Sequence, residues 1–176
     1  MSRLPELNGY VKKTLKIAGI ALILVLLIAL ASLRIFGFEP RDGRPGLWLA
    51  GELVTEPTTD WDFTNQFGEI YLQTNTTYGI PHSVTVWCAV YDGDFYLFSS
   101  YRGGGSFPDK RAWNQNVLRD PRVRLKIGER LFDQTLRHTD DESVRAPVYQ
   151  AFLDKYPDWR SPGQENVHIF LVEPAS

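Results

Sequence analysis

Four polar residues in the middle of the chain carry the functional groups that a phosphate-binding site needs. Ser99 and Ser100 end an apolar run and supply hydroxyl groups, and the basic pair Lys110 and Arg111 follows shortly after them. Hydroxyl groups and cationic side chains both donate hydrogen bonds to phosphate oxygens, and the charged donors form the stronger bonds. The pattern favours an anion-binding site, and solvated charges at the start of a surface helix are the alternative interpretation.

The charge distribution also favours an anion-binding site. Residues 102–130 contain eight basic and three acidic residues, a net charge of +5, whereas residues 37–176 together have a net charge of −6. A locally basic segment in an acidic domain attracts anionic ligands. The net charge of the whole chain, −2, argues against nucleic acid as its main partner.

The elements that would position these residues begin with a β-hairpin. Residues 82–90 are rich in β-branched and aromatic side chains, and residues 95–100 continue in the same manner. Between them stands Asp92-Gly93, a strong signal for a two-residue turn. We therefore expect two antiparallel strands, with the two serines at the end of the second.

A short helix is expected next, over residues 109–120. Ser106 or Asp109 can cap its start, and Pro121 ends it. Trp113 and Val117 lie four residues apart, and this spacing places both on one face of a helix.

The remaining pattern consists of short apolar runs separated by turn residues. Hairpin links between such runs are typical of an antiparallel barrel, and several small barrels share this pattern. The helix between two of the strands favours a split barrel. Further strands are predicted over residues 46–54, 69–74, 121–127, 130–138 and 166–172, and a second helix over residues 140–155.

This order of elements resembles the pyridoxamine 5'-phosphate oxidase-like flavin-binding split-barrel family. In that family a short basic helix follows a hairpin, and an Asn/Asp-Pro-Arg-Val sequence opens the next strand; here residues 120–123 read Asp-Pro-Arg-Val. Residues 80–82 (IPH) and 98–100 (FSS) match family positions on either side of the hairpin. The resemblance covers residues 48–171 and implies a mainly β fold, an antiparallel split β-barrel with two short helices.

The resemblance also implies a cofactor, FMN or a deazaflavin, and an oxidoreductase activity on a small-molecule substrate. In this family the redox chemistry passes through the flavin ring, so no catalytic side chain is assigned. A homodimer with the cofactor at its interface is implied as well. The implied cofactor-binding residues are Ser83, Val84, Thr85, Val86 and Trp87 beside the ring, Ser99, Ser100, Lys110 and Arg111 at the phosphate, and Trp113 in the wall.

Two positions depart from the family pattern. The arginine that usually precedes the strand-opening proline is Ile80 here, and the usual helix lysine is Trp113, so the basic pair is displaced by about one helical turn. These departures favour a rival from another class, a non-catalytic barrel that holds flavin, haem or a lipid at the membrane. The enlarged loop at residues 103–105 is either a surface turn or a flap near the ligand.

The N-terminal part predicts a membrane anchor. A polar basic tail (residues 1–16) precedes an apolar segment (residues 17–38) that contains a single charge, Arg34, and is long enough to span a bilayer. Residues 39–45 are a linker, and residues 46–176 form the barrel domain. The basic tail favours a single-pass orientation with the N-terminus in the cytoplasm. A cleaved signal peptide is the alternative, because Ala29-Leu30-Ala31 matches a cleavage site.

The single cysteine and the three histidines have no metal-ligand spacing. We therefore expect no metal site. Cys88 has no partner for an internal disulfide and lies in an apolar run, which predicts a buried side chain.

Overall fold

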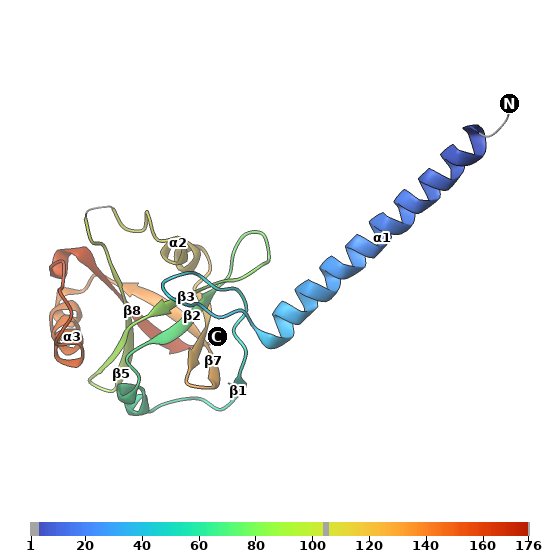
Figure 1. Cartoon of the computed structure of the whole chain (residues 1–176). Coiled ribbons are helices and arrows are strands. Elements are labelled where there is room, and N and C mark those ends of the chain that lie inside the picture. Colours follow the sequence, from blue (N-terminus) through green and yellow to red (C-terminus); the bar gives the residue numbers. More distant parts are fainter. Residues whose placement is uncertain (1–3, 104–105, 176) are drawn as a thin grey trace.

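The computed structural model describes residues 4–103 and 106–175 and consists of a β-barrel domain preceded by one long helix (Figure 1). The strands are β1 (Glu52–Val54), β2 (Ile70–Thr74), β3 (His82–Val86), β4 (Cys88–Tyr91), β5 (Asp94–Ser100), β6 (Arg122–Ile127), β7 (Arg130–Thr139) and β8 (Val167–Pro174). The helices are α1 (Leu4–Phe36), α2 (Ala112–Arg119) and α3 (Glu142–Lys155), with short 3-10 turns at Asp62–Gln66 and Gln164–Asn166.

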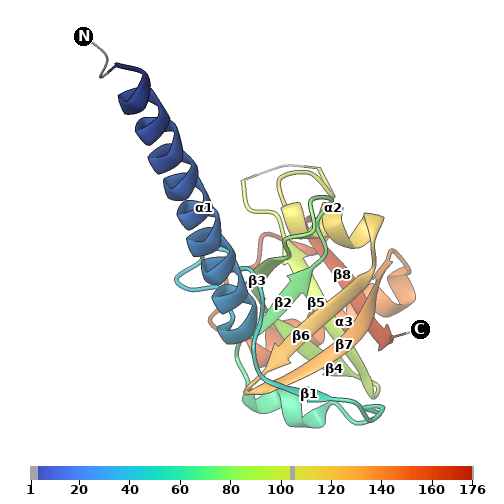
Figure 2. The same cartoon turned by 90° about the vertical axis from the view of Figure 1, so that its right-hand side faces the viewer.

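Seven strands form one antiparallel path in the order β3-β2-β6-β7-β8-β5-β4, and β1 adds to β7 as a parallel partner (Figure 2). Tight turns explain the hairpins. Asp92 and Gly93, between β4 and β5, both have positive φ angles (52° and 81°), as a two-residue hairpin turn requires. The predicted fold, a mainly β antiparallel split barrel with few helices, is confirmed, and the parallel β1 is an addition to it.

The run at residues 82–90 was predicted to be one strand, and that prediction is wrong in detail. The ladder breaks at Trp87, so that β3 pairs with β2 while β4 pairs with β5. Because β3 and β4 are the two ends of the strand order, this one bent segment joins both edges of the sheet. β3 and β5 are not paired there, and this is the split in the barrel.

Two apolar clusters stabilise the domain. The barrel interior is filled from several strands, with Leu72, Phe95 and Leu125 fully buried. Helix α3 covers the outside of β4, β5 and β8 through Val148 and Phe152, both fully buried, as its predicted apolar stripe requires. Asp141 caps this helix by accepting a hydrogen bond from the Ser143 amide.

Two further boundaries differ from the predictions. The strand expected over residues 46–54 is reduced to β1, and Gly46 makes only an isolated bridge to Ser83. Helix α2 begins at Ala112 without a side-chain cap, not at residue 109. The chain before it is held by ring contacts, because the Phe107 ring stacks on the rings of both His138 and His168.

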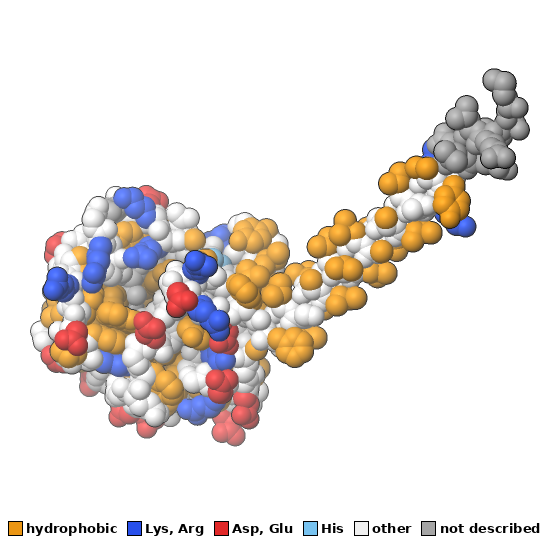
Figure 3. All heavy atoms as spheres, in the orientation of Figure 1, with side chains coloured by type: hydrophobic (Ala, Val, Ile, Leu, Met, Phe, Trp, Pro, Cys, Tyr) orange, Lys and Arg blue, Asp and Glu red, His pale blue; other side chains and the backbone are white. Residues whose placement is uncertain are grey.

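Helix α1 extends for 33 residues and ends at Phe36, so it covers part of the expected tail and the expected span except for its last two residues. Gly37 follows it with a φ of 75°, which is typical of a helix terminus. Gly9–Phe36 is long and apolar enough to cross a membrane, and none of this window is buried against the barrel (Figure 3). By length and composition α1 is a candidate membrane span; an N-terminal signal sequence has the same properties.

The linker is bonded to the barrel. Phe38 donates its amide hydrogen to the Trp48 carbonyl and accepts from the Leu47 amide, each over 2.7 Å. Glu39 forms an ion pair with Lys126, a β6 side chain that is only 7% exposed. The first barrel contacts therefore begin within two residues of the end of α1.

Candidate cofactor-binding site

A cavity of about 240 Å³ lies at the split, between the ends of β3 and β5 and beside α2. We call it the split cavity. Seven of the ten residues predicted to bind the cofactor line it, although they come from three separate elements. They are Thr85, Val86, Trp87, Ser99, Ser100, Arg111 and Trp113, and the lining is completed by Phe98, Arg102 and Trp159.

The free edge of β3 supplies backbone hydrogen-bonding groups. Ser83 exchanges both of its backbone hydrogen bonds with Gly46, on the side of β3 that faces away from β2. Alternate residues of an antiparallel strand direct their N–H and C=O groups to the same side, so Thr85 directs its own groups toward this outer edge. An amide donor and a carbonyl acceptor side by side can hold the polar edge of a planar ring.

An aromatic wall faces this edge. The Trp87 indole stacks on the Tyr156 ring with centroids 4.4 Å apart, and it meets Trp159 edge-on at 5.9 Å. Its Nε1 donates to Glu69 over 3.3 Å, which sets the orientation of the indole. Large flat surfaces held in this way can pack against a tricyclic ring and exclude water from it.

Ser99 is held by a residue that the sequence analysis did not identify. Asn114 on α2 is fully buried, and its Nδ2 donates to the Ser99 hydroxyl over 3.0 Å and to the Tyr101 hydroxyl over 2.7 Å. Among the described residues, its Oδ1 is a buried acceptor with no hydrogen-bond partner. An asparagine in a helix pattern gives no sequence signal for this role, because the role depends on packing between α2 and β5.

Two arginines lie at the cavity. Arg111, at the start of α2, donates from Nη2 to the Ser100 carbonyl over 2.7 Å, which holds it against the end of β5. Arg102 donates from Nη2 to the Arg160 carbonyl, also over 2.7 Å. Arg102 was part of the basic segment but was not predicted as a site residue. Together they give the cavity two cationic donors and no carboxylate in its lining.

Three predicted site residues do not line the cavity. Ser83 is fully buried under Gly46, and Val84 points to the other face of β3, where it packs against the barrel core. Lys110 has a left-handed backbone (φ 63°) just before α2 and lies outside the cavity lining. Successive side chains of a strand point to opposite faces, yet Thr85 and Val86 both reach the cavity because they lie next to the bend. Alternation alone therefore does not explain why Ser83 and Val84 lie outside the cavity lining. Gly104 and Gly105 of the expected turn or flap lie outside the described residues.

A wider groove of about 1120 Å³ adjoins the split cavity. The linker between α1 and the barrel forms one of its sides, and Glu69 and Tyr71 contribute from the β2 side. Thr85 and Trp87 line both spaces. A ligand in the cavity would therefore have room beside it for a second molecule.

The residues present fit a flavin-like group. A narrow cavity with indole walls accepts a planar ring, an unpaired strand edge suits the polar side of that ring, and the arginine pair suits an attached phosphate. A volume of 240 Å³ lies at the small end for ligand sites, so the cavity holds a ring and leaves the rest of such a cofactor outside.

Known proteins share the fold of this chain. Among solved structures, a conserved hypothetical protein from Mycobacterium tuberculosis matches 65% of this chain and 78% of its own length, with 18% identity and a TM-score of 0.50. An F420 reductase matches 69% of this chain and 97% of its own length, with 15% identity and the same TM-score. These likenesses show the fold. No curated protein matches significantly.

The family profile is more specific. The profile of the F420H(2)-dependent quinone reductases matches residues 70–171, which is more than half of the chain and includes every residue that lines the split cavity. This stretch holds all of the barrel strands from β2 to β8, with the exception of the last residues of β8. The protein therefore belongs to the F420H(2)-dependent quinone reductase family, and is a flavin- or deazaflavin-dependent oxidoreductase by family and fold.

Proposed function

We propose that this protein is a membrane-anchored reductase that binds reduced deazaflavin F420 in the split cavity and reduces a quinone-type acceptor in the adjoining groove. The observation that carries the proposal is the convergence on one cavity of a free β3 edge, an indole wall and Arg111. Family membership supports the choice of F420 over FMN.

The proposed residue roles follow from the geometry. Thr85 holds the polar edge of the ring through its backbone, Trp87 packs on the ring, and Arg111 binds the phosphate beside the end of β5. Asn114 positions the Ser99 hydroxyl at the same end of the cavity. We propose these roles in place of the implied roles of Ser83, Val84 and Lys110.

When bound, a reduced deazaflavin supplies a hydride ion, and a quinone that takes up this hydride and one proton becomes the hydroquinone. The protein contributes placement. The residues shared by the cavity and the groove, Thr85 and Trp87, lie where the two bound molecules would meet. Their part is to hold both planes in contact and to exclude water, and no side chain is assigned as an acid or base.

Anchoring through α1 is part of the proposal. The apolar segment at residues 17–38 would cross the bilayer once, with residues 1–16 in the cytoplasm, residues 39–45 as the link and residues 46–176 as the catalytic domain. A quinone with a long apolar tail is itself dissolved in the lipid, so an anchored barrel meets its substrate at the membrane surface. We further propose a homodimer, in which the partner covers the open side of the split cavity.

The test is a titration of the full chain in a non-ionic detergent with F420 and, separately, with FMN, followed by cofactor fluorescence. We expect saturable binding of F420, weakened about tenfold by Arg111→Gln because a charge-assisted hydrogen bond is lost. Arg137→Gln is the matched control: Arg137 lies on β7, paired with Glu173 and outside the cavity.

Turnover is then measured with reduced F420 and a soluble quinone. Quinone-dependent oxidation of the cofactor supports the reductase. Binding of F420 without turnover by any quinone would favour the rival, a non-catalytic binding barrel, which the departures at Ile80 and Trp113 suggested. A folded protein that binds neither cofactor overturns the proposal.

A further inference from the structure

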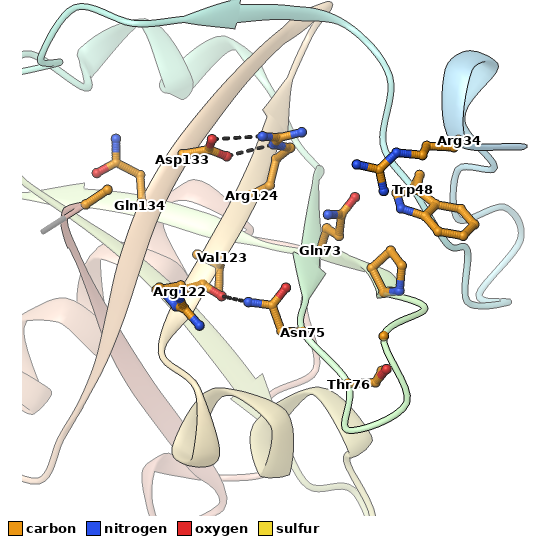
Figure 4. A pocket seen from close by; sticks show the side chains of 13 residues that line it. Arg34, Trp48, Gln73, Asn75, Thr76, Arg122, Val123, Arg124, Asp133 and Gln134 are labelled. Carbon is orange, nitrogen blue, oxygen red and sulfur yellow. Dashed lines mark hydrogen bonds and ion pairs between the residues drawn. The ribbon is translucent and has the colours of Figure 1, made fainter. Parts of the chain in front are cut away.

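A second pocket, which we call the arginine pocket, lies on the barrel wall next to the end of α1 (Figure 4). Its volume is about 380 Å³, and it shares no lining residue with the split cavity or the linker groove. Three arginines line it from distant parts of the chain: Arg34 from the last turn of α1, and Arg122 and Arg124 from β6. Trp48 lies beside Arg34 in this lining (Figure 4).

Carboxylates hold two of these guanidinium groups in place. Arg124 donates from Nε and Nη2 to the two oxygens of Asp133, over 2.6 and 2.8 Å, and Arg122 makes the same paired contact with Asp120, over 2.8 Å each. Each pair uses one side of the planar fork, so that the Nη1 side remains outside the pair. The two forks are therefore positioned in advance and still carry donors for a further anion.

Arg34 adds a positive charge without a compensating acid. In the part of the chain that the structure describes, no carboxylate lies within 4 Å of it, and its guanidinium group points into the pocket toward Gln73 (Figure 4). Three arginines against Asp120 and Asp133 leave the pocket with a net positive charge. Such a site attracts a phosphate group, whose oxygens accept several charge-assisted hydrogen bonds at once.

The position of the pocket identifies the source of the phosphate, provided that α1 spans the membrane as proposed above. The span Gly9–Phe36 contains 28 residues. Its length is about 42 Å, close to the thickness of a bilayer with its headgroups. Arg34 is two residues from its end and is the first charge after the apolar run, so it lies at headgroup depth. Trp48 is of the type that favours this interface.

We propose that the arginine pocket binds the phosphate of an anionic phospholipid. Arg34, Arg122 and Arg124 donate to the phosphate oxygens, and the Trp48 indole lies against the lipid beside the headgroup. Bound in this way, the lipid joins α1 to β6 and holds the barrel in one orientation on the membrane. This inference rests on the proposed anchoring but not on the cofactor or the substrate.

The experiment uses the full chain in a non-ionic detergent, titrated with short-chain phosphatidylglycerol and, in parallel, with short-chain phosphatidylcholine, and measured by native mass spectrometry. We expect phosphatidylglycerol to bind at least about tenfold more tightly. Arg34→Gln should abolish this preference, because it removes the unpaired cation from the pocket. Arg34 is exposed on α1, so its replacement leaves the barrel core untouched. Arg122→Gln is the second variant, and it should reduce the preference in the same direction.

The matched control is Arg44→Gln, which removes an exposed arginine from the same juxtamembrane region but outside the pocket. It should keep the preference for phosphatidylglycerol, whereas a general attraction of basic residues to anionic lipid would be weakened equally by both changes. Equal loss in the two variants, or equal binding of the two lipids, overturns the proposal.

Further measurements distinguish failure of the lipid assignment from failure of the proposed anchor or of the proposed cofactor site. Inorganic phosphate that competes as well as the lipid would assign the pocket to a soluble anion and overturn the lipid assignment. Resistance of the chain to alkaline extraction from membranes tests the anchor alone, and F420 titration of the same sample tests the cofactor site alone. A chain that stays in the membrane and binds F420 but shows no headgroup preference contradicts only the present inference.

Discussion

Asn114 on α2 donates a hydrogen bond to the hydroxyl group of Ser99 on β5, 3.0 Å away, and both side chains are buried. This bond joins the helix before the Asp120-Pro121 turn to the strand that ends at the split cavity. It couples the helix and the strand that form two walls of the site, so it is a direct target for mutation.

Asn114→Ala should lower the free energy of unfolding by about 2 kcal/mol, because it leaves the Ser99 and Tyr101 hydroxyls without their buried donor. It should also weaken F420 binding. Ser99→Ala removes only one partner and should cost less. In urea unfolding, the double variant should lose less than the sum of the single variants. Strict additivity would mean that the two side chains are not coupled.

Glu39→Gln should destabilise the barrel, although Glu39 belongs to the linker. Burial lowers the pKa of Lys126, but the hydrogen bonds that it donates to Glu39 and Glu129 outweigh this and raise the pKa, so Lys126 stays charged. Removing one acid leaves a buried cation poorly compensated, at a cost of about 1–3 kcal/mol. Glu129→Gln is the control: this side chain is 91% exposed, so its loss should cost much less. Equal losses would place the stabilising contact elsewhere.

The stability of the domain should fall between pH 7 and pH 5. Burial lowers the pKa of His138 and of His168, whose rings both stack on Phe107 with centroids 4.2 and 4.3 Å from it. Asp140 opposes this shift at His138, and Arg145 adds to it. The unfolded chain therefore binds protons first, and stability is lost as the pH falls below 6.5 and through the lower folded pKa.

His168→Phe should make that loss smaller, because one proton-binding difference is removed while the stack on Phe107 is kept. The urea midpoint at pH 7 and at pH 5 measures the effect for both proteins. Burial also lowers the pKa of His82, so His82 should preserve part of the pH dependence of stability in the variant. The acids Asp120 and Asp141 have a lowered pKa and titrate below this window. An unchanged slope in the variant would show that His168 is not the group that titrates.

F420 binding should quench part of the tryptophan fluorescence. Trp87, Trp113 and Trp159 line the split cavity, whereas Trp48 lines the arginine pocket on another wall. Trp159→Phe should reduce the fraction of emission that F420 quenches, and Trp48→Phe should raise it, because it removes emission that the cofactor does not reach. Identical quenching in both variants would argue that the cofactor binds outside the split cavity.

Local signals predicted most of the fold. The Asp92-Gly93 turn, the alternating strands and the Trp113–Val117 face all depend on neighbouring residues, and each is present in the structure. The bend at Trp87 was not predictable, because nothing in the run from residue 82 to 90 interrupts its strand propensity. The ladder breaks there because the two halves pair with different strands, which is a property of the closed barrel.

The site was predictable only as far as the family resemblance placed it. The basic segment was interpreted as one anion site, but the folded chain divides it: Arg111 lies at the split cavity and Arg122 and Arg124 at the arginine pocket. The arginines of β6 lie in a different pocket from Arg111 at the start of α2, and the spacing of these residues in the sequence does not predict this separation. Asn114 and Trp159 were missed for the same reason, since their roles arise from contacts between elements.

The Glu39–Lys126 ion pair has an evolutionary consequence. A helix and a barrel joined by an inert tether could be exchanged between genes as independent modules. Here the linker supplies one of the two carboxylates that pair with a buried barrel cation, so a transplanted barrel that begins after residue 39 keeps only the exposed Glu129 as a partner for Lys126. Recombination that supplies a new N-terminal segment must also supply an acid at this position, and so the junction is inherited with the barrel.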